Sequence, residues 1–437
     1  MVRTIASLVA VIGVSGCMSF GSGADGDGVT RFRGSPLGAS AAAKQAKQAK
    51  QDADSIIMSD LQGRRSVLPD GSAFDKVAVP VLAANSRAAE SELRVARLNA
   101  EAQSKNWLPT LGPSISLSSL GEVLASLVID AVIFDNGKKK AEREFARADV
   151  EVAAVNLAID TNDRVHTALG LYLKGQKAQE KAALYQAALK DLSRFEYIMN
   201  ERVKGGVSDL SDLSVIRHKL AKVQSDYTAE AEAAKGAVAE LNAMSVKKLG
   251  GISGLADVQV SSSDARALSV LLAEAEKSRT VAGAKIDRAG FLPSLTASAD
   301  VTKTGVSGGA NLAPANGLGF GTGASLKAIE AATEAAGRRV SQATEDANRK
   351  LAKREARLAA LSRQVGEASG LAGQAKANLD LFQQQYDAGQ RQVMDVVGVY
   401  EGWIAQEEAR IDLKYEMAAT RFEIASELGL LVDGSDI

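Results

Sequence analysis

The stretch Trp107-Leu108-Pro109-Thr110-Leu111 returns 184 positions later as Phe291-Leu292-Pro293-Ser294-Leu295. A second pair of stretches, Gly206 to Leu213 and Gly389 to Val396, is separated by 183 positions and shares the register of the first pair. Two landmarks in one register indicate an internal duplication, because a chance match would rarely keep both. We therefore expect the chain to consist of two copies of one structural unit.

Each Leu-Pro landmark is followed by residues that alternate between apolar and small polar side chains. This period of two is typical of a β-strand with two different faces. It predicts strands at 111–119 and 124–134 in the first copy and at 294–304 and 317–327 in the second. Each strand is about 9–11 residues long, which is the length that a tilted strand needs to cross a bilayer.

Long segments without proline follow each pair of predicted strands. They predict a long helix at 138–203 with a return helix at 209–245, and a long helix at 329–387 with a return helix at 393–429. Between Leu351 and Tyr386, apolar residues recur every three or four positions, which indicates a helix packed lengthwise against a neighbour, as in a coiled coil. The glycines at 205–206 and 389 are expected to end the two long helices.

The second copy is expected to be longer than the first between its strands and its long helix. The best match to Ala148 in the second copy is Ala343, which lies 195 positions on instead of 184. The extra residues would fall in the glycine-rich stretch 305–323, as a longer hairpin or an outward loop.

The N-terminus carries a pattern typical of export. An apolar run from Ile5 to Val14 is too short to cross a bilayer as a helix, but it suits a secretory signal peptide. Small residues before Cys17 resemble the processing site of bacterial lipoproteins, which would make Cys17 the lipidated first residue of the mature protein. An ordinary signal peptide with a chance cysteine is the alternative.

These patterns predict five regions. They are a lipoprotein signal peptide at 1–16, a lipid anchor and flexible segment at 17–75, a first repeat at 76–250, a second repeat at 262–430 and a C-terminal tail at 431–437.

The composition excludes several classes of protein. A net charge of −1 gives no electrostatic footprint for nucleic acid. A single cysteine excludes an internal disulfide framework and a cysteine-based metal site. No nucleophile–base arrangement or metal-ligand spacing stands out, so we expect no catalytic residues, no cofactor and no metal.

Four amphipathic strands are too few to form a membrane pore alone. The smallest bacterial barrels have eight strands, and an open sheet edge in lipid leaves backbone groups unpaired at a cost of several kcal/mol each. If the strands enter a membrane, several protomers must share one barrel. The strand pattern therefore predicts an oligomeric pore.

At this point the chain resembles the TolC-like outer-membrane efflux family, also called outer-membrane factors, over about residues 76–430. The resemblance rests on the order and duplication of several motifs. These are Leu-Pro-x-Leu at 108–111 and 292–295, the junction Phe134-Asp135-Asn136-Gly137, the turns at 206–213 and 389–396, and the closing helix from Tyr415 to Gly429.

The resemblance implies a mostly α-helical homotrimer in the bacterial outer membrane, in contact with outer-membrane lipid. Four strands per protomer would form a shared twelve-stranded β-barrel, and the coiled-coil-like helices would form an α-helical barrel in the periplasm. Such proteins are passive exit ducts of tripartite efflux pumps or type I secretion systems. Their partners are a periplasmic adaptor and an inner-membrane transporter of the RND, ABC or MFS type.

The resemblance also implies particular site residues. The tips that gate the channel and dock the adaptor map to Gly205, Gly206, Ser208, Asp209, Asp212, Gly389, Gln390, Arg391 and Asp395. Asp395 falls on the position of a gate-lining aspartate, but its partner position is Gly398. Asp212 and Asp395 could instead be acids of a first helical turn, which the helix dipole favours.

The barrel–helix junction maps to Trp107, Pro109, Phe291 and Pro293. The two aromatic rings fit either an interfacial belt or simple core packing. Nearby, Lys138, Lys139 and Lys140 fit either lipid head groups or a solvated helix start. An alternative to the duct is a lipid-anchored, non-conducting coiled-coil scaffold of the periplasm.

Overall fold

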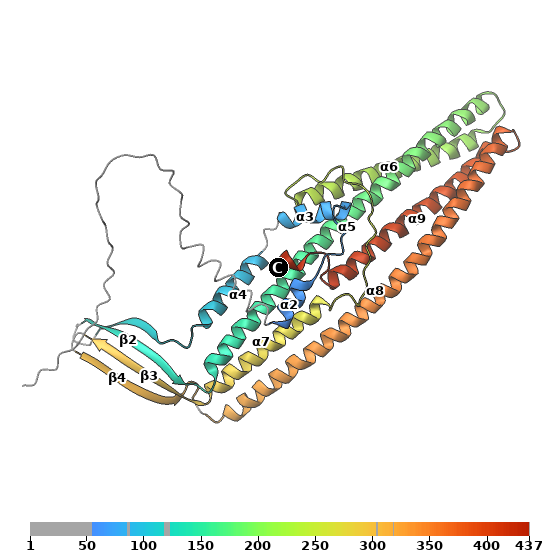
Figure 1. Ribbon diagram of the computed structural model, residues 1–437. Coiled ribbons are helices and arrows are strands. Elements are labelled where there is room, and N and C mark those ends of the chain that lie inside the picture. Colours follow the sequence, from blue (N-terminus) through green and yellow to red (C-terminus); the bar gives the residue numbers. More distant parts are fainter. Residues whose placement is uncertain (1–54, 85–87, 118–122, 303–304, 318, 437) are drawn as a thin grey trace, which may run out of the picture. The chain divides into compact units, whose positions relative to one another are not determined.

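The computed structural model describes residues 55–84, 88–117, 123–302, 305–317 and 319–436. The described helices are α2 (Ile56–Gly63), α3 (Ala73–Ala83), α4 (Ala89–Gln103), α5 (Lys138–Lys204), α6 (Leu210–Ala243), α7 (Leu268–Gly290), α8 (Thr322–Asp387) and α9 (Val393–Glu427) (Figure 1). The strands are β1 (Thr110–Leu117), β2 (Val123–Phe134), β3 (Pro293–Thr302) and β4 (Gly305–Pro314), and a short 3-10 helix spans Gly434–Asp436. The predicted signal peptide, Cys17 and residues 18–54 lie outside the described residues.

The four strands form one antiparallel sheet in the order β1-β2-β3-β4. Strands β1, β2 and β3 lie within a few residues of their predicted positions. The prediction of a strand at 317–327 is wrong, because β4 spans Gly305–Pro314 and α8 already begins at Thr322.

The position of β4 follows from the pairing of antiparallel strands. Thr302 pairs with Gly305, so β4 forms a tight hairpin with β3. An antiparallel strand needs only a short turn to reach its partner, and the segment directly after β3 meets that condition. The alternation at 317–323 came largely from glycines, which carry no side chain and therefore specify no face.

The predicted insertion in the second copy is also wrong. Gly137 caps the start of α5 and Gly321 caps the start of α8, and these two residues are again 184 positions apart. The stretch 305–323 holds β4 and the start of α8 instead of an extra loop. A shift of 11 residues equals three helical turns, so an alanine-rich helix matches itself nearly as well at 195 as at 184.

The long helices pair within and between the copies. α5 packs along α6 and α7 and also touches α3, α4 and α9, whereas α8 packs along α9 and α7 (Figure 1). On the seam predicted for α8, Leu351, Leu361 and Leu379 are buried. The two copies therefore form two helical hairpins, α5–α6 and α8–α9, which meet through α5 and α9.

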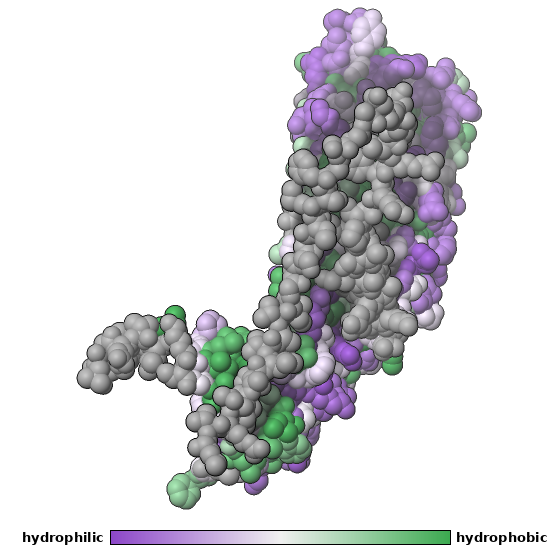
Figure 2. Space-filling model, turned by 60° about the vertical axis from the view of Figure 1, so that its left-hand side comes forward, coloured by the Kyte–Doolittle hydropathy of each residue, from purple (hydrophilic) through white to green (hydrophobic). Residues whose placement is uncertain are grey.

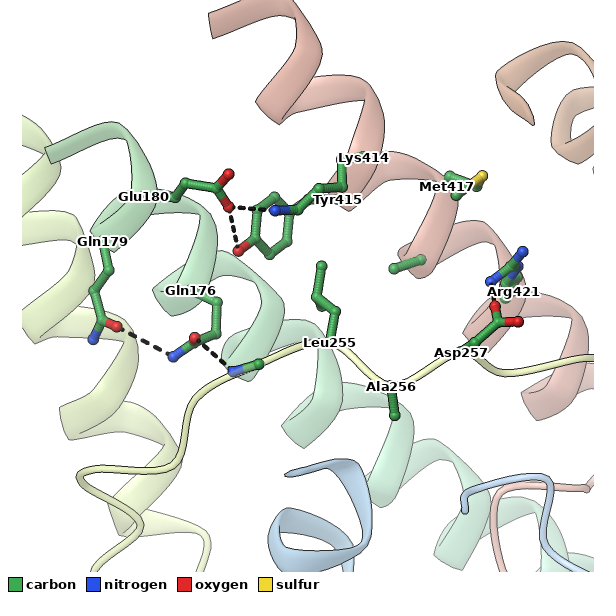
Figure 3. Close-up of a pocket in the computed structure, with 12 residues that line it drawn as sticks. Gln176, Gln179, Glu180, Leu255, Ala256, Asp257, Lys414, Tyr415, Met417 and Arg421 are labelled. Carbon is green, nitrogen blue, oxygen red and sulfur yellow. Dashed lines mark hydrogen bonds and ion pairs between the residues drawn. The ribbon is translucent and has the colours of Figure 1, made fainter. Parts of the chain in front are cut away.

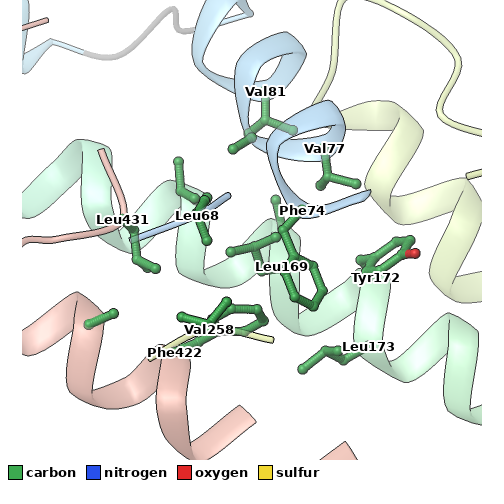
Figure 4. Packing of buried hydrophobic residues seen from close by; sticks show 14 of the residues in the cluster. Leu68, Phe74, Val77, Val81, Leu169, Tyr172, Leu173, Val258, Phe422 and Leu431 are labelled. Carbon is green, nitrogen blue, oxygen red and sulfur yellow. The ribbon is translucent and has the colours of Figure 1, made fainter. Parts of the chain in front are cut away.

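A core of aromatic and aliphatic side chains joins the two copies near the middle of α5. Phe74 of α3 packs edge-to-face against Tyr172 of α5 and Phe422 of α9, with ring centroids 5.9 Å and 4.9 Å away (Figure 4). Phe74 and Phe422 are both fully buried. Because these rings come from three helices, this core fixes the first repeat against the second.

The described end of the predicted flexible segment is packed against the helices. Within α2, the apolar residues Ile57, Met58 and Leu61 are buried, since their spacing places them on one helical face. The prediction of flexibility for 17–75 is therefore wrong for residues 55–75. An eight-residue helix with three buried apolar residues is too short to stand out from a flexible segment in the sequence.

The C-terminal residues hold this N-terminal segment in place. The backbone N–H of Val67 donates to the carbonyl of Leu430 at 2.9 Å, and that of Gly434 donates to the carbonyl of Arg64 at 3.1 Å. The buried Arg64 guanidinium also donates to the carbonyl of Leu428. We call residues 64–68 and 428–434 together the terminal clasp.

Candidate functional site

The sheet carries one apolar and one mainly polar face. Residues that pair directly across neighbouring strands lie on the same face, and successive residues of one strand lie on opposite faces. The register of the four strands therefore assigns each residue to one of two faces. The apolar face includes Leu111, Ile115, Leu127, Val301, Val306 and Leu312, and the opposite face includes Thr110, Ser126, Asp130, Ser298, Asp300 and Asn311. The six apolar side chains are all exposed, and Figure 2 shows hydrophobic residues gathered over the sheet.

Both outer strands of the sheet have one edge that no other described strand covers. Among the described residues, β1 pairs with β2 alone and β4 pairs with β3 alone. Pro113 lies in β1, where the missing N–H is tolerated because edge strands need not donate along both sides. An exposed apolar face with two open edges is the geometry that a further sheet or a second copy of the chain can complete.

The junction between the sheet and the helices is tied by two asparagine side chains. Asn106 Nδ2 donates to the carbonyl of Lys139 at 3.1 Å, which binds the entry of β1 to the start of α5. Asn136 Nδ2 donates to the carbonyl of Pro293 at 2.8 Å, which binds the end of β2 to the start of β3. Asn136 has a φ of 53°, a left-handed conformation that asparagine tolerates better than most residues.

The predicted junction residues all lie at this end of the sheet. Trp107 is 66 % exposed, Phe291 is half-buried, and Pro109 and Pro293 are exposed. The exposure of Trp107 argues against core packing for its ring.

The two helix tips have the same backbone geometry. At the first tip, Gly206 has a φ of 73°, and the N–H of Val207 donates to the carbonyl of Arg202 at 2.9 Å. At the second tip, Gly389 has a φ of 75°, and the N–H of Gln390 donates to the carbonyl of Gln385 at 2.8 Å. Both turns are Schellman motifs, in which a left-handed glycine ends the helix.

The predicted tip acids begin the return helices. Asp395 accepts the N–H of Gln392 at 3.2 Å and forms a capping box with it, so its carboxylate stabilises the start of α9. Asp212 lies in the first turn of α6, and Asp209 is the residue before that helix. Asp395, Asp209 and Gly398 are exposed. A helix-capping role for Asp395 is thus present in the structure, and a role at a gate stays a prediction.

The side chains of the two tips differ although their backbones agree. Val207 and Leu210 of the first tip are 67 % and 72 % exposed. Their counterparts 183 positions on are the polar Gln390 and the buried Val393. The second tip also carries Arg391, whose guanidinium lies 4.4 Å from the ring centre of Phe382, whereas Arg202 at the first tip donates to Ser208 at 3.1 Å.

Polar contacts join α5 to α9 below the tips. Tyr400 Oη donates to Asp191 at 2.8 Å, and Lys181 Nζ lies 2.8 Å from Asp412. Each pair joins residues that are more than 200 positions apart, so sequence spacing gave no signal for either contact.

A carboxylate on α5 anchors the lower part of this contact. Glu180 accepts hydrogen bonds from Lys414 Nζ at 2.6 Å and Tyr415 Oη at 2.9 Å (Figure 3). Burial alone raises the pKa of Glu180, but these bonds and the charges of Lys414 and Arg410 outweigh burial and hold that pKa below its usual value. Burial and the same carboxylate raise the pKa of Tyr415.

Glu180 also borders an open groove of about 720 Å³ between α5, α9 and the segment 254–257 (Figure 3). The second carboxylate of this groove, Asp257, pairs with Arg421. Both acids are therefore held in ion pairs, an arrangement that stabilises helix packing.

The described residues contain neither a metal-binding cluster nor a membrane-spanning helix. No group of three or more His, Cys, Asp or Glu side chains is placed to hold a metal ion. None of the described helices combines the length and apolar composition required to cross a membrane.

No family model and no curated protein matches the sequence. Solved structures do match. A membrane protein from Pseudomonas aeruginosa aligns with a TM-score of 0.72 at 18 % identity, over 86 % of this chain and 93 % of its own. The open-state MtrE outer membrane channel of Neisseria gonorrhoeae aligns with a TM-score of 0.69 at 18 % identity, over 86 % of this chain and 96 % of its own.

The outer membrane protein VceC of Vibrio cholerae aligns with a TM-score of 0.68 at 15 % identity, over 82 % of this chain and 95 % of its own. The chain has the fold of the TolC-like outer-membrane channels. The predicted fold is therefore confirmed in that the chain is mostly helical and carries a small four-stranded antiparallel sheet, whereas the shared barrel stays a prediction.

Proposed function

We propose that the chain is one protomer of a homotrimeric outer-membrane duct, through which substrate leaves a periplasm-spanning efflux or type I secretion assembly. The observation that carries the proposal is the sheet, which has an exposed apolar face, a polar face and two open edges. Three such sheets joined edge to edge give twelve strands and leave no edge unpaired in lipid. The apolar face then meets hydrocarbon and the polar face lines water.

The fold supports this proposal. Solved structures that align over most of the chain include the MtrE channel and the CmeC outer membrane channel of Campylobacter jejuni. A passive duct needs no catalytic group, and both acids of the groove beside Glu180 are already paired. We therefore propose a non-enzymatic role with no cofactor.

The helix tips are the proposed ends of the duct. Both tips expose backbone turns and charged side chains at the far end of the long helices (Figure 1). We propose that they constrict the channel and dock a periplasmic adaptor, which links the duct to an inner-membrane transporter. Cys17 is the proposed lipid anchor in the outer membrane.

The test replaces residues on one face of the sheet and compares them with neighbours on the other face. Ala299→Lys with Ala310→Lys places charges on the apolar face in the middle of β3 and β4, and Ser298→Lys with Asn311→Lys places them on the polar face. A lysine at the middle of the bilayer costs about 2–4 kcal/mol, so the first pair should fail to insert. The second pair should insert and conduct in planar bilayers.

The outcome separates the duct from the scaffold. A scaffold anchored only by lipid would tolerate both pairs of substitutions equally, and it would not conduct. Native mass spectrometry in detergent should give three copies for the wild type. A monomer after extraction, or conduction by the Ala299→Lys and Ala310→Lys protein equal to wild type, contradicts the proposal.

A further inference from the structure

Two lysines at the start of α5 carry charges that the neighbouring acids leave uncompensated. Lys138 makes no ion pair with any residue that the structure describes. Lys140 has a side chain that is 76 % exposed and lies 4.0 Å from Glu144. Lys285 of α7 lies 2.6 Å from the same carboxylate. Because it is closer than Lys140, Lys285 is the main ion-pair partner of Glu144.

The other acids of this region are engaged within the junction. Asp135 accepts the backbone N–H of Lys139 at 2.6 Å, which caps the start of α5. Glu142 lies 3.6 Å from the Lys139 ammonium and accepts a hydrogen bond from Asn106 at 2.9 Å. Arg143 is directed inward and donates to the side-chain oxygen of Asn106 at 2.7 Å, so the outward-facing positive charge of the junction lies on Lys138 and Lys140.

Exposed aromatic rings lie at the same level of the molecule. Trp107 is 66 % exposed and follows Asn106, whose side chain is bonded to the first turn of α5. Phe134 is 57 % exposed and ends β2 on the apolar face, where it pairs with Leu295. The order along the molecule is thus an apolar face, then aromatic rings, then cations.

We propose that Lys138 and Lys140, beside Trp107, bind the phosphate groups of anionic glycerophospholipids in the leaflet on the helix side of the membrane. The order of apolar face, ring and cation matches the change from hydrocarbon to head group across a bilayer surface. The proposal rests on the proposed insertion of the sheet, and it adds the class of lipid that the duct prefers.

The duplication shows which residues can replace the lysines. Residues 184 positions on from Lys138 and Lys140 are Thr322 and Ala324, at the start of α8. Both helices begin after a glycine cap, so the helix start does not depend on the lysines. Lys138→Thr with Lys140→Ala therefore removes both charges and introduces the residues that the second copy has at the same positions.

The test measures lipid retention in detergent, so it does not require an open pore. Full-length protein is mixed with micelles that contain equal amounts of phosphatidylglycerol and phosphatidylcholine, and native mass spectrometry counts the lipids that stay bound. Wild-type protein should retain more phosphatidylglycerol than phosphatidylcholine. A lysine near a lipid surface contributes roughly a fivefold preference for anionic lipid, so the double variant should lose most of it.

The control removes two exposed lysines of α6, by Lys222→Thr with Lys235→Ala, and should keep the wild-type preference. Added salt should weaken the preference of the wild type, because exposed charges are screened. Equal retention of the two lipids by wild type, or an unchanged preference in the double variant, overturns the proposal. Loss of conductance with an intact lipid preference would instead contradict only the proposed duct.

Discussion

The side-chain amide of Asn136 donates a 2.8 Å hydrogen bond to the backbone carbonyl of Pro293, and so joins the last residues of the first hairpin to the first residue of the second. These residues are 157 positions apart. The bond keeps β2 and β3 together at the point where both strands meet the helices.

This bond can be separated from the backbone conformation of the same residue. Asn136→Gly keeps the left-handed φ and removes the hydrogen bond, which should cost about 1 kcal/mol. Asn136→Ala also loses the tolerance for positive φ, which adds about 1–2 kcal/mol. Thermal unfolding in detergent should rank wild type above the glycine variant and the glycine variant above the alanine variant. If the two variants are equally stable, the left-handed conformation at position 136 does not contribute to stability.

The left-handed glycines at the tips should tolerate substitution poorly. Gly206→Ala and Gly389→Ala should each destabilise their tip by about 1 kcal/mol, because only glycine adopts positive φ without strain. Gly205, with a φ of −79°, is the matched control, and Gly205→Ala should be nearly neutral. Proteolysis confined to the tips is the measurement. Equal cutting of the Gly205 and Gly206 variants would argue against this account.

The contact between α5 and α9 should weaken in acid. Because the pKa of Glu180 is below its usual value of 4.5, its ionised form stabilises the folded state above that pH. The stabilisation is lost as the pH falls below 4.5 and through the lowered pKa. Glu180→Gln should remove this part of the pH dependence of thermal unfolding below pH 4.5. An unchanged slope in the glutamine variant would show that other acids carry it.

The terminal clasp should be needed to hold the N-terminal segment. A Cβ at position 434 would lie 1.9 Å from the carbonyl oxygen of Leu61, so Gly434→Ala must displace one of the two backbones. Residues 55–72 should then become sensitive to protease while the long helices stay intact. Gly398→Ala, whose added Cβ meets nothing within 4 Å, is the control. Resistance of the Gly434→Ala protein equal to wild type would contradict the role of the clasp.

The aromatic core should carry much of the stability of the joined repeats. Phe74→Ala leaves a cavity between Tyr172 and Phe422 and should cost about 3–5 kcal/mol. Phe74→Leu should cost less, because it fills part of that space. The loss of the helical circular dichroism signal on heating measures the stability of both variants. If Phe74→Ala melts at the wild-type temperature, the surrounding side chains have filled the cavity and the ring does not carry this stability.

Several features could be predicted because they depend on local patterns. The glycine turns at 206 and 389, the start of α5 after Gly137, and strands β1 to β3 follow from residues next to each other in the sequence. The strand at 317–327 and the 11-residue insertion were wrong for a physical reason. Glycine and alanine carry too little side chain to specify a face or a register.

Other features were beyond any local pattern. The apolar residues of α2 are buried against α4, α5 and α7, and the segment after α2 is bonded through Arg64 and Ser66 to C-terminal residues more than 360 positions away. The contact between Tyr400 and Asp191 depends on how two helical hairpins meet. At the site, the tip and junction residues could be named, but not the bonds from Asn106 and Asn136 that position the sheet.

The nearly equal lengths of the two long helices have a consequence for the far end of the molecule. α5 has 67 residues and α8 has 66, so both hairpins reach about 100 Å from the sheet and end at one level. In the proposed trimer, six turns would form a flat rim that a partner could approach from six directions. Val207 and Leu210 of the first tip correspond to Gln390 and the buried Val393 of the second. The rim would therefore alternate between three tips with exposed apolar side chains and three without them. A partner with sixfold symmetry would therefore meet six turns of the same backbone shape whose side chains repeat only three times.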